Sequence, residues 1–253
     1  MPPLPARPVA GWPYDHPKRA RSRRGPPSTW CFTAPSVLGG LAPGRGGCTL
    51  GWMSTGSADY RIAPANESPW EDLQRVLGST ASARRCHCQR YKLARGESFA
   101  RLGPDELAHR LRSQTDPDTP DSPGTTGLLA YAGTDPVGWC AVQPRTEYAG
   151  LLRVSKVPWE GRAEDKTDDG VWAVTCFVTR AGCRKRGVAS ALACAAPEYA
   201  RAHRARALEA YPITTTAAIS EELHVGMVGM FESAGFRQVS APTLRRILMR
   251  IDF

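Results

Sequence analysis

The order of the predicted elements gives a mixed α/β fold, in which helices flank a central sheet. Residues 171–178 are rich in β-branched and aromatic types and carry no charge, as in a buried strand. Apolar residues then recur over residues 188–203 at the i, i+3, i+4 spacing of an amphipathic helix. Residues 126–132 and 137–142 predict two neighbouring antiparallel strands, joined at Gly133–Pro136.

The preceding part of the chain predicts one strand and two helices. Residues 60–63 are typical of a short opening strand. Residues 68–77 begin with Ser-Pro, which predicts a helix cap followed by proline at the first helical position. A second helix is predicted over residues 103–114. Residues 143–170 are polar and too many for a simple turn, so we expect a functional or mobile loop there.

The C-terminal part predicts a strand, a helix and two closing strands. Residues 207–211 favour a strand, and a helix is predicted from its cap at Ser220 to its stop at Gly235. The closing strands are predicted over residues 236–239 and 246–253. In the last strand, inward apolar residues alternate with outward charged ones: Ile247, Met249, Ile251 and Phe253 against Arg246, Arg250 and Asp252.

Charge and composition separate an N-terminal extension from the rest of the chain. The formal net charge is +9, of which residues 1–52 contribute +6 because they hold seven basic residues and one acid, Asp15. These residues are rich in proline and glycine and show no hydrophobic period, so we expect a disordered extension. Met53 is an alternative natural start. The folded domain is expected over residues 59–253.

Composition also bounds the class of protein. An apolar content of 42% is enough for a sizeable core, and no apolar run reaches the length of a bilayer span, so no membrane association is predicted. A nucleic-acid partner is disfavoured, because the basic N-terminal segment lacks the aromatic residues of a stacking platform.

The eight cysteines favour free thiols in a reducing cytoplasm over a disulfide framework, since Cys140 and Cys176 fall inside predicted buried strands. Cys86-His87-Cys88 offers half of a metal site at an unusual spacing, and no second Cys/His pair is present in the sequence. We therefore predict no metal, and expect this segment to flank a substrate cleft as a helix or loop.

The turn between the strand at 171–178 and the following helix is basic and rich in glycine. A strand, a glycine loop and a helix start together form an anion site, because the first N–H groups of the helix lack partners. Gly182 and Gly187 have the spacing of a P-loop, but Val188-Ala189 stands where a nucleoside triphosphatase needs Lys followed by Ser or Thr. The G-x-G-x-x-G dinucleotide pattern is absent. The predicted ligand carries phosphate.

Arg184-x-x-Gly187-x-Ala189 resembles the pyrophosphate loop of the GCN5-related N-acetyltransferases (GNAT), which reads Gln/Arg-x-x-Gly-x-Gly/Ala. Two downstream segments extend the resemblance. Residues 208–212 look like the next strand of that family, and Met230–Phe236 looks like its L-Y-E-K-x-G-F segment. The resemblance covers residues 59–253 and implies a largely antiparallel sheet.

The resemblance also implies an N-acetyltransferase with acetyl-CoA as the acyl donor and a small-molecule amine or a protein amine as the acceptor. A homodimer is compatible with it. The pyrophosphate would lie on residues 183–189, with the pantetheine arm near the end of the strand. The implied cofactor-binding residues are Phe177, Val178, Arg184, Lys185, Arg186, Gly187, Val188 and Ala189.

The catalytic groups are less evident than the cofactor loop. Family members often place a tyrosine acid where this chain has Phe231, which cannot donate a proton. Tyr211, His224 or water could replace it. Glu209 is a candidate base if its carboxylate faces the cleft with a raised pKa, and is otherwise part of a solvated strand face. A non-catalytic acyl-CoA-binding domain of the same fold is the alternative function.

Overall fold

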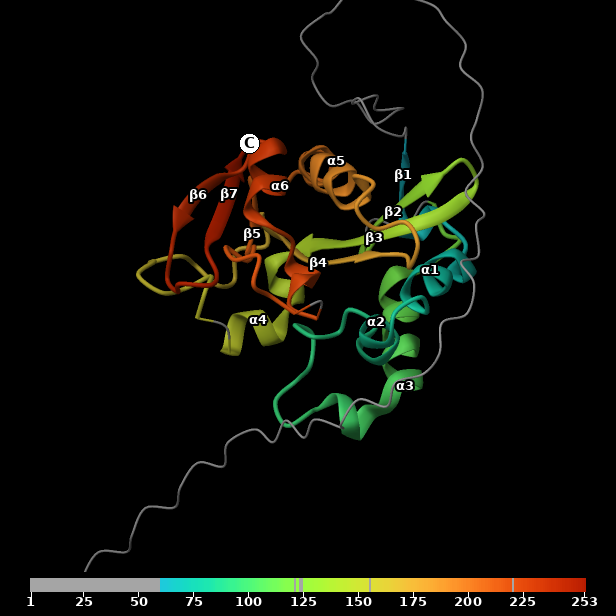
Figure 1. The fold of residues 1–253 in the computed structure, drawn as a ribbon. Coiled ribbons are helices and arrows are strands. Elements are labelled where there is room, and N and C mark those ends of the chain that lie inside the picture. Colours follow the sequence, from blue (N-terminus) through green and yellow to red (C-terminus); the bar gives the residue numbers. More distant parts are fainter. Residues whose placement is uncertain (1–59, 121, 123–124, 155, 220) are drawn as a thin grey trace, which may run out of the picture. The chain divides into compact units, whose positions relative to one another are not determined.

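A mixed sheet organises the described part of the chain, which in this computed structural model comprises residues 60–120, 122, 125–154, 156–219 and 221–253 (Figure 1). All of these residues belong to one structural unit. The strands lie in the order β1-β2-β3-β4-β5-β7-β6, and β4 and β5 alone run parallel among the pairs of this sheet. Their bounds are β1 Arg61–Pro64, β2 Gly127–Ala132, β3 Asp135–Pro144, β4 Val171–Thr179, β5 Ala207–Ala210, β6 Arg237–Ser240 and β7 Leu248–Asp252. The predicted mixed α/β fold with a largely antiparallel sheet is confirmed.

Helices cover both faces of this sheet. They are α1 Trp70–Leu77, α2 Ala81–Cys86, α3 Phe99–Thr115, α4 Ala149–Val154, α5 Val188–Ala202 and α6 Val228–Ser233, with 3₁₀ turns η1 Ala65–Glu67, η2 Arg145–Glu147 and η3 Leu223–Val225. Figure 1 shows α5 and α6 on one side of the sheet and α1, α2 and α3 on the other. The predicted extension at residues 1–52, the start at Met53 and the helix cap at Ser220 lie outside the described residues.

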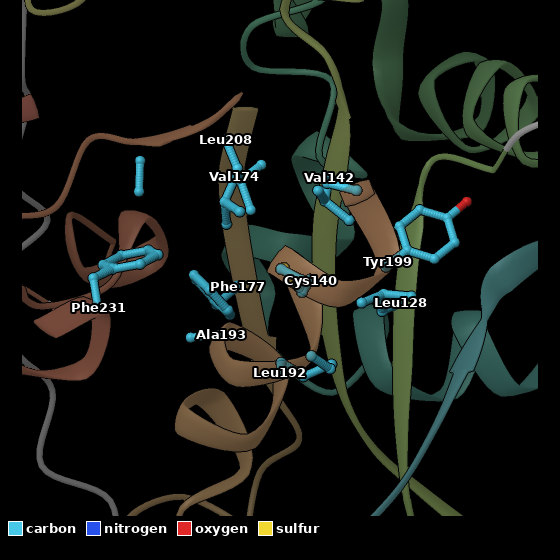
Figure 2. Packing of buried hydrophobic residues seen from close by; sticks show 14 of the residues in the cluster. Leu128, Cys140, Val142, Val174, Phe177, Leu192, Ala193, Tyr199, Leu208 and Phe231 are labelled. Atoms are coloured by element: carbon cyan, nitrogen blue, oxygen red, sulfur yellow. The ribbon is translucent and has the colours of Figure 1, made fainter. Parts of the chain in front are cut away.

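The alternation of side chains along the strands divides the core between the two faces. Leu128, Cys140 and Phe177 point toward α5, where they pack with Leu192 and other helix residues (Figure 2). The residues between them in the strands pack instead against α1 and α3: Leu129, Tyr131, Trp139, Ala141, Cys176 and Val178 contact Leu73, Val76, Leu77 and Leu111. The middle strands are therefore buried on both sides, which explains their continuous apolar sequences.

The start of α5 approaches β3 closely at Gly138. A Cβ atom there would lie 2.3 Å from Cγ1 of Val188 and 3.1 Å from Cδ1 of Leu192. We expect Gly138→Ala to reduce the free energy of unfolding by about 1–3 kcal/mol through overpacking. Thermal unfolding measures this as a fall in Tm, and adding Val188→Ala should restore part of the loss.

A matched control for Gly138 is available in α6. A Cβ at Gly229 meets nothing within 4 Å, so Gly229→Ala should leave Tm unchanged or slightly raised. Equal losses of Tm in the two alanine variants would contradict the proposed contact between Gly138 and α5.

Three predicted helix boundaries differ from the structure. Helix α1 begins at Trp70 and not at the Ser68 cap, because the Ser68 hydroxyl donates to the carbonyl of Pro64. Helix α3 begins four residues before the predicted start, at Phe99, and bends at Gly103, whose φ is 75°. The last predicted helix is broken at Gly226, whose φ of 79° separates η3 from α6.

The alternation predicted for the last strand is also partly wrong. Arg250 was expected to face outward, but it is only 9% exposed, because β7 lies between β5 and β6 inside the sheet. Its guanidinium is paired with Glu209, 2.9 Å away. No helix among the described residues is long and apolar enough to cross a membrane.

Candidate active site

The parallel strands β4 and β5 part after a short pairing and leave an open edge. They pair from Val171 to Val174 on β4, and β5 then ends at Ala210. Beyond it, Ile213 bridges to Met227 and Arg246 instead. Residues Thr175–Thr179 of β4 therefore continue without β5 as a neighbour.

A cleft of about 290 Å³ lies along this free edge. All five residues from Thr175 to Thr179 line it, although their side chains alternate between faces, so the cleft follows the edge of the strand itself. Its other walls come from three separate segments, namely Thr80, Ser82, Ala83, Cys86, Cys88, Arg90 and Tyr91, then Arg184 and Ala189, then Glu221, Leu223, His224, Gly226, Met227 and Met230. The segment around Cys86 and Cys88 thus flanks a cleft, as predicted.

The loop from β4 to α5 presents a helix start without a side-chain cap beside the cleft. Gly187 is the N-cap of α5 with φ 85° and ψ −1°, and no side chain caps the helix. The first turn of α5 contains no acidic residue. Arg184, Lys185 and Arg186 are exposed, and none has a carboxylate at ion-pair distance within the described residues. Backbone N–H groups and the helix dipole are thus combined with three free cations.

Contacts with three other elements hold this loop in place. Arg180 donates to Oδ1 of Asp135 at 2.6 Å, which joins the loop to the first residue of β3. The hydroxyl of Tyr60 donates to the carbonyl of Arg186 at 2.8 Å, and the N–H of Ala181 donates to Oγ of Ser79 at 3.3 Å. The anion site is therefore built before any ligand binds.

His224 is the predicted catalytic residue that the structure does bring to the cleft. Its Nδ1 lies 2.7 Å from the carbonyl of Glu221, which fixes the proton on Nδ1. Its Nε2 is buried and has no hydrogen-bond partner in the part of the chain that the structure describes. Burial, together with the charge of Arg90, lowers the pKa of His224 to about 4. Around neutral pH the imidazole is therefore neutral, with the lone pair of Nε2 free.

Tyr91 lies beside His224 in the same cleft, with 6.4 Å between the ring centroids. Tyr91 thus contributes a phenol, which can donate a proton, to the lining of the cleft. Sequence analysis placed the segment 86–91 next to the cleft but assigned Tyr91 no role, because no spacing relates it to His224.

Glu209 and Tyr211 lie outside the lining of the cleft, in a buried cluster of charges. The carboxylate of Glu209 accepts from Arg145 at 3.2 Å, Arg162 at 2.7 Å and Arg250 at 2.9 Å. The hydroxyl of Tyr211 donates to the same carboxylate at 2.9 Å. The structure thus brings Glu209 and Tyr211 together, but not with His224.

The expected rise in the pKa of Glu209 is wrong. Burial raises the pKa, but the hydrogen bond from Arg162 and the charges of Arg162 and Arg145 outweigh it, so the pKa of Glu209 is lowered. The alternative of a solvated strand face is also wrong, because the side chain of Glu209 is 0% exposed. Burial and the neighbouring Glu209 raise the pKa of Tyr211 well above its usual range.

Arg145 and Arg162 come from the polar segment before β4, and the sequence gives no sign that they are buried. Arg145 is fully buried with its guanidinium 4.6 Å from the centre of the Trp159 ring. Phe231, at the position of the family's usual acid, is fully buried against Phe177 and Phe236.

Comparison with known proteins finds similar solved structures and a matching family model. The solved structures that resemble the chain include Ard1 from Thermoplasma volcanium, with 12% identity, a TM-score of 0.39, and coverage of 76% of this chain and 97% of the other. They also include the PaiA N-acetyltransferase from Thermoplasma acidophilum in complex with coenzyme A, with 13% identity, a TM-score of 0.41, and coverage of 77% of this chain and 99% of the other. A third is an N-acetyltransferase from Staphylococcus aureus Mu50, with 11% identity, a TM-score of 0.44, and coverage of 77% of this chain and 99% of the other.

No curated protein matches the chain. The sequence model of the acetyltransferase (GNAT) family matches residues 91–236, which is more than half of the chain and includes β4, the basic loop and α5. The chain therefore belongs to the acetyltransferase (GNAT) family.

Proposed function

We propose that the protein is an acetyl-CoA-dependent N-acetyltransferase, which moves an acyl group from the CoA thioester to an amine by direct attack. The observation that carries the proposal is the uncapped start of α5 at Gly187, which opens on the cleft along the free edge of β4. Family membership supports the same reaction class.

The residues present fit the cofactor. The pyrophosphate would be held by Arg184–Ala189, through N–H groups of the first turn of α5 and the charges of the loop. Phe177 and Val178 would contact the pantetheine arm, whose amide groups suit the unpaired edge of β4. When bound, the cofactor supplies a thioester carbonyl that an amine can attack.

The acceptor amine would approach beside His224 and Tyr91. The Nε2 of His224 would accept a proton from the attacking amine, and the Tyr91 hydroxyl would donate one to the departing thiolate. Glu209 and Tyr211, predicted as catalytic from the sequence, are assigned a different role here. The bonds of Glu209 with Arg145 and Arg162 hold the segment before β4 against β5, and the Tyr211 hydroxyl donates to the same carboxylate.

His224→Gln should lower kcat about 10²–10⁴-fold with little effect on the Kd for CoA, since Gln cannot take the proton. In the wild type, activity that depends on His224 should be lost only as the pH falls through about 4, where the imidazole becomes charged. His203→Gln is the matched control, because His203 makes the same kind of Nδ1 contact, with Tyr199, at the end of α5. Equal rates for the two variants would remove His224 from the mechanism.

Transfer from acetyl-CoA to a panel of small amines and lysine peptides, followed by CoA release and product mass, tests the proposal. An acetylated product supports it. Tight CoA binding with no product from any acceptor would favour the alternative, a non-catalytic acyl-CoA-binding domain.

We also propose that the acetyltransferase domain comprises residues 59–253, with residues 1–52 as a separate extension. A chain that begins at Met53 should then keep its CoA affinity and its Tm, since residues 1–52 show no hydrophobic period and carry an excess of proline and positive charge. A large fall in Tm on truncation would contradict these boundaries.

A further inference from the structure

Two buried thiols meet in the wall of the cleft. The Sγ atoms of Cys88 and Cys176 lie 3.1 Å apart, and both cysteines are free. They are 6% and 7% exposed, and both line the cleft, so a small solute in the cleft can reach them. A disulfide needs an S–S distance of about 2.05 Å, so the sulfurs must approach by only about 1 Å.

The surroundings hold the two sulfurs toward each other. The indole N–H of Trp139, on β3, donates to Sγ of Cys88 at 3.1 Å, and the thiol of Cys88 donates to Sγ of Cys176 on β4. Trp139 and Cys176 lie on the paired strands β3 and β4, where Trp139 is opposite Val178 and Ala141 is opposite Cys176. Cys88 lies outside the sheet, in the turn that follows α2.

That segment is under backbone strain. His87 and Cys88 have φ values of 42° and 54°, the left-handed region that residues other than glycine seldom adopt. Among the described residues, the buried Nδ1 of His87 has no hydrogen-bond partner. The side-chain amide of Gln89 donates to Gln114 at 2.9 Å, and the carbonyl of Tyr91 accepts from the N–H of Gly150 at 2.7 Å. The Cys88 sulfur adds its contacts with Trp139 and Cys176 to these, three residues before Tyr91.

We propose that Cys88 and Cys176 form an oxidation site, at which a peroxide joins them in a disulfide that fixes the 87–91 wall to β4. One thiolate attacks the O–O bond, giving a sulfenic acid and, after protonation of the leaving oxygen, water. The second thiol attacks the sulfenic sulfur, the S–O bond breaks, and a second water leaves. Two thiols are thus oxidised and one peroxide is reduced to two waters.

The cross-link should stabilise the fold and slow acyl transfer. It closes a loop between residues 88 apart in sequence, so Tm should rise by roughly 5–15 °C. The rate of acyl transfer should fall at least about threefold, because Tyr91 and its neighbours can no longer adjust their positions to the acceptor. This kinetic part rests on the proposed function, whereas the linkage and the Tm do not.

The test treats the full chain with hydrogen peroxide at mildly alkaline pH, because contact with Cys176 and burial raise the pKa of Cys88. Remaining thiols are alkylated, and tryptic peptides are mapped by mass. The expected product joins peptide 86–90 to peptide 167–180, with loss of two hydrogen atoms. Dithiothreitol should reverse the linkage, the rise in Tm and the loss of transfer.

Variants identify the pair. Peptide 86–90 carries both Cys86 and Cys88, so the linkage should persist in Cys86→Ser and disappear in Cys88→Ser and in Cys176→Ala. Cys140→Ala is the matched control, because Cys140 is fully buried on the other face of the sheet. A Cys86–Cys88 linkage, or a linkage that forms only after denaturation, would overturn the proposal. If no amine is acetylated but the linkage and Tm respond, the proposed function fails and the oxidation site stands.

Discussion

Replacing Gly187 by valine should weaken CoA binding by at least roughly a hundredfold while the fold stays intact. Gly187 caps α5 with φ 85°, a conformation that a β-branched residue adopts only under strain. The added Cβ would also lie where phosphate oxygens must come within about 2.7–3.1 Å of backbone N–H groups. Calorimetric titration of CoA measures the effect, and circular dichroism monitors the fold.

Two comparisons distinguish the loss of space for the phosphate in Gly187→Val from the loss of a positive charge and from backbone strain. Arg184→Ala or Lys185→Ala removes one exposed cation and should cost about 1–3 kcal/mol of binding free energy, with 3′-dephospho-CoA showing which phosphate each one contacts. Gly161→Val is the matched control for strain, because Gly161 has φ 71°, open space around its Cβ position and no place in the cleft. If Gly187→Val binds CoA like the wild type, the loop does not hold the cofactor.

Glu209→Gln should destabilise the fold by about 3–5 kcal/mol, because Arg145, Arg162 and Arg250 lose the buried carboxylate that they share and keep only the partly exposed carboxylate of Glu164 in common. The carboxylate is 0% exposed, and Arg145 and Arg250 are buried with it, so water cannot replace the lost charge. Thermal and urea unfolding measure the loss. Tyr211→Phe is the milder comparison, since it removes one hydrogen bond to the carboxylate and should cost about 1.5–3 kcal/mol.

The pH dependence of this effect has a definite sign. The pKa of Glu209 is lower in the folded chain than in the unfolded one, so the stabilisation is fully present above the ordinary carboxyl pKa of 4.5. It is lost as the pH falls through the lowered value. The difference in stability between wild type and Glu209→Gln should therefore be largest at neutral pH and shrink under strongly acidic conditions. If the difference in stability between wild type and Glu209→Gln did not depend on pH, the ion pairing of Glu209 would be contradicted.

The cofactor half of the site can be predicted from the sequence, because its signals are local. The strand at β4, the basic turn and the helix of α5 follow one another directly, and Gly187 marks the point where they join. The catalytic half cannot, since Tyr91 and His224 are far apart in the chain and meet only through the fold. Polar residues around them resemble those of any surface loop.

The buried charge cluster was missed for a related reason. Residues 143–170 are mostly polar, and no pattern distinguishes the fully buried Arg145 from a solvated arginine. The sequence around Glu209 shows only the strand in which it lies. The environment of its carboxylate depends on the side chains of Arg162 and Arg250, which come from other segments. The break at Gly226 is likewise invisible to helical periodicity, which continues across it.

A proline two residues beyond the end of β5 affects the size of the cleft. Pro212 has no N–H group and cannot extend the strand pairing, so β5 ends at Ala210 and β4 keeps a free edge. Each further residue of pairing would remove about 3.3 Å of that edge. The reach of the cleft along β4 is thus governed by the length of its neighbour, and proteins of this architecture could lengthen or shorten the channel for a donor's arm without any change in the phosphate loop.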